Sequence, residues 1–162
     1  MTHVEKSALV KYSAQQMFDL VNDVESYPQF LPWCNGSRII KHEGNIVDAE
    51  ISIAKGGFQK AFSTRNRLEW GSKMTVSLLE GPFSHLEGVW HFLPLREDAS
   101  KISLDLEFEM SSLLANLAFG AVFNQICNTM VSSFTQRAKS VYTANKAMEN
   151  TLLADHLQIR QN

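Results

Sequence analysis

The chain has 162 residues, of which 44% are hydrophobic and 20% are charged, and its formal net charge at pH 7 is −2. These values fit one globular domain with a sizeable core and argue against wholesale disorder. The mild acidity excludes a protein whose whole surface binds nucleic acid phosphates, and we expect no DNA partner.

The two cysteines, Cys34 and Cys127, are too few for a disulfide framework or for a zinc site built on cysteines. We expect both to be reduced thiols in a cytoplasmic protein. No run of 18 apolar residues occurs, and charged residues interrupt the N-terminal segment. The sequence therefore predicts neither a membrane span nor a signal peptide.

The first elements in chain order are a strand and two short helices. Residues 3–11 alternate loosely between apolar and polar side chains, as a strand does. Ser13 precedes a run of helix formers, and Gln16 stands at the capping-box position of that helix. Pro28 and Pro32 then limit the next segment to a short, broken helix that is rich in aromatic residues.

Residues 37–110 carry strand and turn signals. Turns, most of them containing glycine, separate runs in which apolar and polar residues alternate, and the clearest run is KISLDLEFEM at 101–110. The apolar side chains of this run share one face, and its acidic side chains share the other. We predict one antiparallel sheet of about seven strands, counting the first, with a buried face and a solvated face.

Residues 112–145 are predicted to form one long helix. Apolar residues recur in two adjacent ridges, of which the first begins with Leu114 and Ala118, and together they give a wide apolar face. Gly120 lies within this helix and costs about 1 kcal/mol relative to alanine. This order of elements favours an α+β architecture, in which a curved antiparallel sheet wraps around one long C-terminal helix.

Four segments carry motifs that are specific enough to compare with known families. They are the opening segment 7–34, which ends in YPQFLPWC, the TRN at 64–66, GPFSHLEGVWHF at 81–92, and LAFGAVFNQICNTMVSSFTQRAKSVY at 117–142. In this order they resemble the coenzyme Q-binding protein family of START-like, polyketide cyclase-like proteins, and in particular its bacterial branch of ribosome association toxins. The resemblance covers residues 1–145, which we interpret as one START-like domain. Residues 146–162 lie outside it as a C-terminal extension, either the end of the helix or a frayed tail.

The resemblance implies a helix-grip fold with an apolar tunnel between the sheet and the helix. It also implies two functions that different members of the family carry. Some members are tied to ubiquinone binding and respiration. The bacterial branch is described as binding the large ribosomal subunit and blocking subunit association, often with a small ubiquitin-like partner encoded beside it.

Aromatic and aliphatic side chains are the candidates for lining such a tunnel. They either fill an ordinary core or surround a cavity, and the fold that the resemblance implies favours the cavity. A quinone ring would stack on such side chains and needs only one or two hydrogen-bond donors. The predicted cavity residues are Tyr27, Phe30, Trp33, Phe62, Phe83, Leu86, Trp90, Phe92, Leu104, Leu106, Phe119, Val122, Phe123 and Ile126.

Residues 110–136 contain no formally charged side chain, which is unusual for a helix that faces solvent. Two interpretations stay open. The segment is a core helix that the tail or loops cover, or it is a gate that contacts lipid or an isoprenoid tail. The aromatic segment YPQFLPWC has the same two interpretations, a rigid plug at one end of the sheet or a contact with a partner or a membrane surface.

Catalytic and metal-binding motifs are not evident. His85 and His91 are six residues apart on one predicted strand, about 20 Å, which is too far for one metal ion. No paired carboxylates or cysteine ligands are spaced for a site, so we predict neither a catalytic residue nor a metal. A basic patch of Lys60, Arg65 and Arg67 would suit ribosomal RNA or anionic lipid, whereas the simpler interpretation is a solvated strand face.

The sequence therefore predicts a non-enzymatic binding protein with an apolar cavity for ubiquinone or a related polyprenyl lipid, which supports respiratory electron transport. We expect it in the cytoplasm or at the inner membrane as a peripheral protein. The alternative is a toxin-like translation inhibitor that binds the large ribosomal subunit. An enzyme such as a polyketide cyclase ranks third, because fold alone does not imply function.

Overall fold

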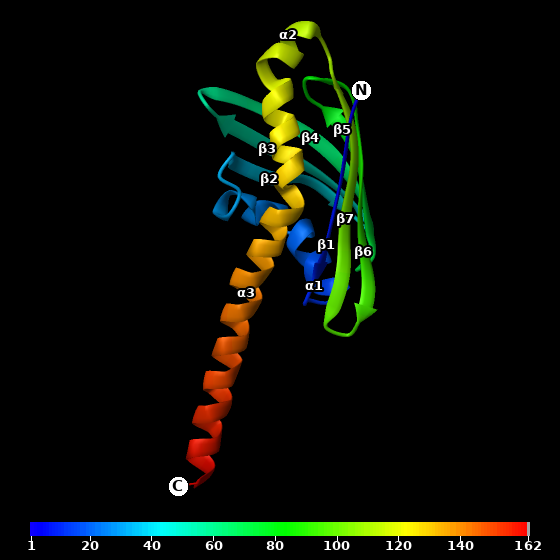
Figure 1. The fold of residues 1–162 in the computed structure, drawn as a ribbon. Coiled ribbons are helices and arrows are strands. Elements are labelled where there is room, and N and C mark those ends of the chain that lie inside the picture. The colour runs from blue at the N-terminus through cyan, green and yellow to red at the C-terminus, as the bar shows by residue number, and fades with distance from the viewer. Residues whose placement is uncertain (162) are drawn as a thin grey trace.

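The structure is a computed structural model, which describes residues 1–161 and the side chains of residues 1–143, 148 and 150–155. A curved sheet and a long helix make up most of it (Figure 1). In chain order the elements are β1 (Thr2–Val10), α1 (Ala14–Asn22), the 3-10 helix η1 (Val24–Gln29), β2 (Cys34–Glu43), β3 (Ile46–Lys55), β4 (Phe58–Glu69), β5 (Lys73–Glu80), β6 (Phe83–Arg96), β7 (Ala99–Met110), α2 (Leu113–Ala115), the π-helix η2 (Asn116–Gly120) and α3 (Ala121–Gln161).

The seven strands form one sheet in the order β1-β7-β6-β5-β4-β3-β2, with antiparallel neighbours throughout. The N-terminal strand therefore lies beside the last strand, and Val4 stands opposite Leu106. In β7 the apolar residues Ile102 to Met110 are buried at every second position, while Asp105 is exposed. The predicted antiparallel sheet, with one buried and one solvated face, is confirmed.

The two short helices close one end of the sheet. Ser13 caps α1, because its hydroxyl accepts from the Gln16 amide at 3.0 Å while the Gln16 side chain accepts from the Ser13 amide at 2.9 Å. This capping box was predicted and is confirmed. The segment η1 contains Pro28, and the hydroxyl of buried Tyr27 donates to the carbonyl of Val21. Burial raises the pKa of Tyr27, so its hydroxyl keeps its proton.

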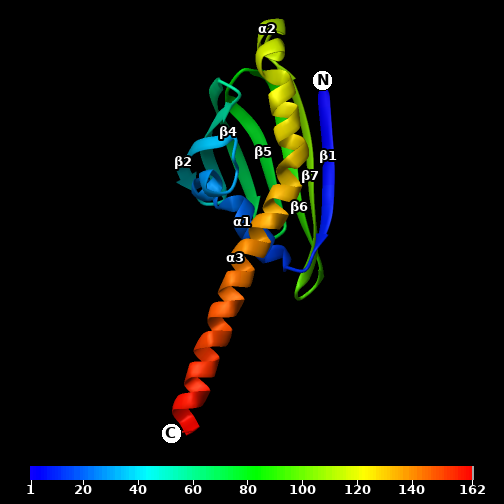
Figure 2. The ribbon, with the colours of Figure 1, turned by 60° about the vertical axis from the view of Figure 1, so that its left-hand side comes forward.

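The long helix differs from the uninterrupted helix predicted over 112–145. A π-helical turn at 116–120 separates α2 from α3, and α3 then continues to Gln161, beyond the edge of the sheet (Figures 1 and 2). A side chain on Gly120 would place its Cβ 2.4 Å from Asn116 Oδ1, so glycine permits the close approach within this turn. Of the residues predicted as an extension, 146–161 are helical, and residue 162 lies outside the described residues.

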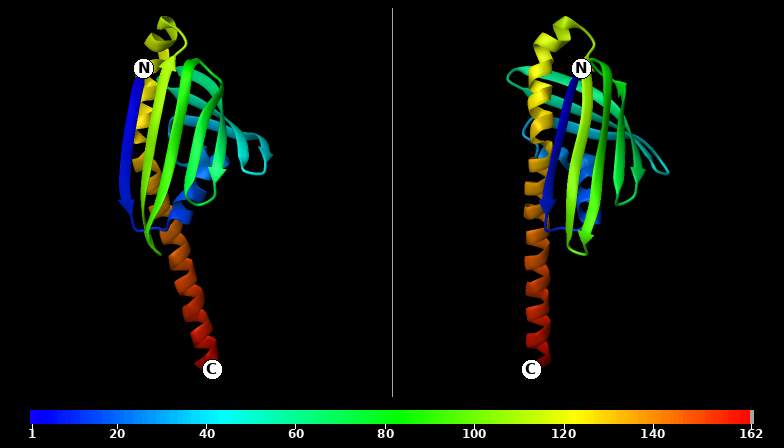
Figure 3. Two further views of the ribbon diagram at one scale, coloured as in Figure 1. Left: turned by 90° about the vertical axis from the view of Figure 1, so that its right-hand side faces the viewer. Right: turned by 45° about the vertical axis from the view of Figure 1, so that its right-hand side comes forward.

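Only one of the two apolar ridges of the helix is fully buried. Phe119, Phe123, Cys127 and Val131 face the sheet, whereas the first ridge begins with Leu114 and Ala118 in an exposed position. The prediction of two packed ridges is wrong at this end, because the start of the helix projects past the sheet (Figure 1). The two views in Figure 3 show that α3 lies against one face of the sheet and leaves the other face open.

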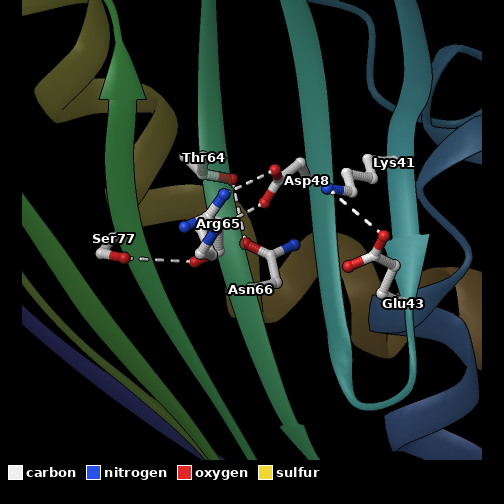
Figure 4. A network of polar contacts seen from close by, with 7 residues as sticks. All are labelled: Lys41, Glu43, Asp48, Thr64, Arg65, Asn66 and Ser77. Atoms are coloured by element: carbon white, nitrogen blue, oxygen red, sulfur yellow. Dashed lines mark hydrogen bonds and ion pairs between the residues drawn. The ribbon is translucent and has the colours of Figure 1, made fainter.

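An ion pair joins β3 and β4 on the open face of the sheet. The Arg65 guanidinium donates two hydrogen bonds of 2.9 Å to the carboxylate of Asp48, which stands opposite it in the register (Figure 4). The Asp48 side chain is only 9% exposed, so it depends on this partner for compensation of its charge. The hydrogen bonds from Arg65 hold the pKa of Asp48 below its ordinary value.

We predict that Arg65→Gln lowers the urea midpoint of unfolding at about pH 7 and that this deficit shrinks as the pH falls to about 2.5. A carboxylate whose pKa is lowered by folding stabilises the protein above its unfolded pKa, and this contribution is lost as the pH falls through the lowered folded pKa. Arg67→Gln is the matched control, because Arg67 makes no ion pair within the described residues. An equal deficit at both pH values would contradict the assignment.

Candidate functional site

A partly enclosed cavity, which we call the inner cavity, lies between the sheet and α3, with a volume of about 90 Å³. Its walls are mostly aromatic and aliphatic. They consist of Val24, Tyr27, Trp33, Ile51, Ile53, Phe62, Thr64, Asn66, Met74, Val76, Leu86, Trp90, Leu104, Leu106, Phe123, Ile126, Cys127 and Met130. Among these described residues none carries a carboxylate, an imidazole or a basic group, and the ionisable side chains are those of Tyr27 and Cys127.

The position of the inner cavity follows from where the helices contact the sheet. The helix α3 packs chiefly against β1 and β7, α1 packs against β6 and β7, and η1 packs against β2. The middle strands β3, β4 and β5 lie between these contacts and supply seven of the lining residues: Ile51, Ile53, Phe62, Thr64, Asn66, Met74 and Val76. The cavity is therefore the space that one helix leaves over the centre of a wide sheet.

Nine of the fourteen residues that sequence predicted for a cavity line this space. They are Tyr27, Trp33, Phe62, Leu86, Trp90, Leu104, Leu106, Phe123 and Ile126. Five others do not line the inner cavity. Phe30, Phe83 and Phe92 pack against other rings, Phe119 stacks on Phe58 at 4.9 Å, and Val122 is half-buried against the core.

Two polar side chains that sequence analysis did not select also line the inner cavity. Thr64 and Asn66 are 4% and 6% exposed and follow Phe62 at alternate positions of β4, so all three face the same way. The Thr64 hydroxyl donates to Asn66 Oδ1 at 2.9 Å (Figure 4). Alternation from Phe62 was the available signal, and it was overlooked because polar residues do not normally mark a buried face.

Both cysteines are free and buried, and Cys127 lines the inner cavity. Burial raises the pKa of each thiol, so both stay protonated at neutral pH. The thiolate is the nucleophilic form of cysteine. The Cys127 thiol on the cavity wall is therefore in its unreactive form.

A second, open space adjoins the inner cavity, and we call it the outer groove. Its volume is about 660 Å³, and it runs between β4, the β5–β6 turn and the start of the C-terminal helix. Its walls consist of Glu50, Phe58, Lys60, Ala61, Phe62, Ser63, Glu80, Gly81, Pro82, Ser111, Ser112, Leu114, Ala115, Ala118 and Phe119. Phe62 belongs to both lists and so stands between the two spaces.

The partition at Phe62 is built from aromatic rings. The Phe62 ring lies 5.7 Å from the ring of Phe83 and 5.8 Å from that of Phe123, both in edge-to-face geometry. Gly81 lies directly behind Phe62, and a Cβ there would come within 2.8 Å of the Phe62 Cβ. Glycine at this turn thus allows the backbone to approach the partition closely.

Three leucines mark the end of the molecule next to the outer groove. Leu113, Leu114 and Leu117 are 74%, 77% and 74% exposed, and we call them the leucine tip. Leu114 also lines the outer groove, so the tip and the groove are continuous. The tip lies at the beginning of the segment that has no formal charge. Within the described residues, no helix is long and apolar enough to cross a membrane.

The predicted basic patch is divided between the two faces of the sheet. Lys60 stands opposite Ile53 and lines the outer groove, on the side that the helix covers. Arg65 and Arg67 occupy alternate positions of the opposite parity and face the open side. Grouping Lys60 with the two arginines is wrong. Successive side chains of a strand point to opposite faces, so Lys60 and Arg65, five positions apart, lie on different faces of the sheet. Arg65 is also already paired with Asp48.

Among the side chains that the structure describes, one group of possible metal ligands comes together, His3, Glu5 and Asp105, whose ligand atoms lie within 4.8 Å of one another. All three are exposed, and His3 Nε2 lies 2.6 Å from Asp105 Oδ1. This hydrogen bond raises the pKa of His3. Spacing motifs did not reveal the group, because it depends on the pairing of β1 with β7.

Comparisons with known proteins agree with this fold. Residues 10–135 match the family described as polyketide cyclase / dehydrase and lipid transport. The chain is 48% identical to the persistence and stress-resistance toxin PasT of Escherichia coli O6:H1, over 89% of this chain and 91% of that protein. It is 46% identical to the ribosome association toxin RatA of Pseudomonas aeruginosa, over 87% and 98%. A mitochondrial coenzyme Q-binding protein COQ10 homolog B from Xenopus laevis is 28% identical, over 85% and 58%.

Solved structures show the same architecture. The Zhui aromatase/cyclase from a Streptomyces species superposes with a TM-score of 0.76 at 17% identity, over 85% of this chain and 93% of that chain. The 18 kDa protein CC1736 from Caulobacter crescentus has a TM-score of 0.67 at 30% identity, over 88% and 99%. The helix-grip fold is thus established, and the chain belongs to the polyketide cyclase / dehydrase and lipid transport family, with proteins named RatA, PasT and COQ10 among its relatives.

Proposed function

We propose that this protein is a non-enzymatic carrier of a polyprenyl lipid such as ubiquinone. The observation that carries the proposal is the pair of spaces that share Phe62, one small, partly enclosed and mostly apolar, the other larger and more open. A lipid with a ring at one end and an isoprenoid tail fits this division. The ring occupies the inner cavity, and the tail lies in the outer groove.

The volumes of the two spaces define what binding requires. The outer groove is within the range of roughly 300–1,000 Å³ that is typical of ligand sites. The inner cavity, at about 90 Å³, holds the equivalent of about three waters, so it must widen to admit a ring. Met74 and Met130 line it, and unbranched methionine side chains can change rotamer at small cost. Rotation of Phe62 would join the two spaces.

The leucine tip gives this carrier a means of reaching its ligand, because a polyprenyl lipid resides in a membrane. Transferring a leucine side chain from water to an apolar medium is worth about 1.5–3 kcal/mol, and three leucines act together at the tip. Contact of the tip with a bilayer would place the outer groove at the membrane surface. The protein would then act as a peripheral membrane protein that takes up or delivers lipid.

A second candidate function is inhibition of ribosomal subunit association, because relatives that are 46% identical over most of their length are named ribosome association toxins. Arg67 on the open face is available to a phosphate, since it makes no ion pair within the described residues. In this function the protein would bind the large ribosomal subunit through that face. A small ubiquitin-like partner would belong to this second function.

We predict that wild-type protein, extracted with organic solvent directly after purification, yields a polyprenyl quinone in near-stoichiometric amount by mass spectrometry. Leu106→Lys should abolish this retention, because it places a charge in the inner cavity, at a cost of several kcal/mol to a bound ring. Val122→Lys is the matched control, since Val122 lies outside the cavity and is half-buried. Both variants must keep cooperative urea unfolding. If Leu106→Lys and Val122→Lys retained equal amounts of quinone, the proposal that the protein is a lipid carrier would be refuted.

For the leucine tip, we predict that Leu113→Glu combined with Leu117→Glu reduces flotation with neutral phosphatidylcholine vesicles at least about tenfold. The control is Leu152→Glu combined with Leu153→Glu, which changes two leucines that are also exposed but lie on the far part of α3. The control should float as the wild type does. Equal loss in both pairs, or none in the tip variant, would show that the tip does not meet the membrane.

For the second function, purified protein should reduce the intact-ribosome peak when separated subunits are mixed in a sucrose gradient. The effect should weaken steeply as salt is raised and should be smaller in Arg67→Gln than in Lys139→Gln, which changes an exposed cation on α3. Undisturbed subunit joining at saturating protein would remove this candidate. Full inhibition by Leu106→Lys would show that it acts independently of the cavity.

A further inference from the structure

Asn66 is the one amide side chain on the wall of the inner cavity in the part of the chain that the structure describes. It is 6% exposed, and its Oδ1 accepts the hydrogen bond from Thr64. That bond fixes which end of the amide is occupied. The Nδ2 group keeps both of its hydrogens, and it donates to none of the described residues.

An amide donor that a ligand covers without accepting its hydrogens is unfavourable, because it loses its hydrogen bonds to water on binding. The remaining side chains of the wall do not relieve this. They are apolar, or they are committed elsewhere, as the Tyr27 hydroxyl is to Val21. Two indole groups, those of Trp33 and Trp90, also line the cavity, but each has a single donor and no oxygen that could fix an orientation.

We infer that Asn66 is the hydrogen-bond donor that selects a ligand with a carbonyl oxygen on its ring. This inference rests on the proposed function and names the chemistry that the inner cavity recognises. Thr64 is the positioning residue, because its hydroxyl holds Oδ1 of the amide toward Thr64 and so directs Nδ2 away from Thr64. A carbonyl that accepts from Nδ2 satisfies the donor, whereas a plain hydrocarbon ring leaves it unpaired.

The pairing accounts for an otherwise costly feature of the sheet. Thr64 and Asn66 occupy the central strand positions where apolar residues would pack at least as well. Their neighbours on the same face of β4, Phe62 and Leu68, are apolar and buried. Binding specificity is a reason to keep two polar residues in this place, since a site with a buried donor rejects ligands that lack the acceptor.

The test compares two probes that differ only in the ring, a para-benzoquinone with a decyl tail and decylbenzene, by isothermal titration calorimetry. Wild-type protein should bind the quinone about tenfold more tightly. Asn66→Leu should lose about five- to tenfold in quinone affinity and keep its affinity for decylbenzene within about twofold. Thr64→Val should lose about two- to threefold for the quinone, because the amide is no longer held in one orientation.

The control is Asn150→Leu, the same substitution at an exposed position on the distal part of α3, which should change neither affinity. Equal losses for both probes in Asn66→Leu would mean a packing defect and would overturn the inference. So would unchanged quinone affinity. Wild-type protein that binds both probes equally would overturn the inference and leave the carrier intact. Wild-type protein that binds neither would overturn the proposed function itself.

Discussion

A sheet of seven strands is much wider than the single helix that must cover it. Strands lie about 4.8 Å apart, so seven span roughly 29 Å, whereas a helix with its side chains is about 10–12 Å across. Curvature brings the two sides of the sheet toward the helix, and α1 and η1 close one end. The middle strands β3 to β5 remain without close cover. The inner cavity thus follows from the number of strands and the single helix that grips them.

The two faces of the sheet solve the problem of charge in different ways. On the open face, charged residues pair across strands, as Arg65 does with Asp48 and Arg38 with Glu50. On the covered face, the lining of the inner cavity has no charged side chain among the described residues, and its polarity is confined to a few neutral groups. A ligand in the proposed site on the covered face would therefore be recognised through hydrogen bonds and shape, whereas the open face presents charged groups.

Much of the fold could be predicted from sequence because it depends on local patterns. Alternation identified β7, and the capping box at Ser13 identified the start of α1. Cavity membership could not be predicted in the same way, because it depends on which part of a strand lies beneath a helix. Leu86 and Phe92 share a face of β6, yet Leu86 meets the cavity and Phe92 packs on Phe18. Likewise, periodicity predicted the apolar ridge that begins at Leu114, but it could not predict that this part of the helix lies beyond the end of the sheet.

The pairing of β1 with β7 also governs how the chain acquires this structure. Val4 meets Leu106 only after some hundred intervening residues have been made, and α3, which comes later still, packs on the same edge. Contacts so far apart in sequence carry a large loop-closure entropy and slow the folding of a sheet. During synthesis the first strand therefore waits without a partner while the other six are made. In that interval its unpaired edge is available to chaperones or to a second chain, and the sheet becomes complete only after β7 has been made.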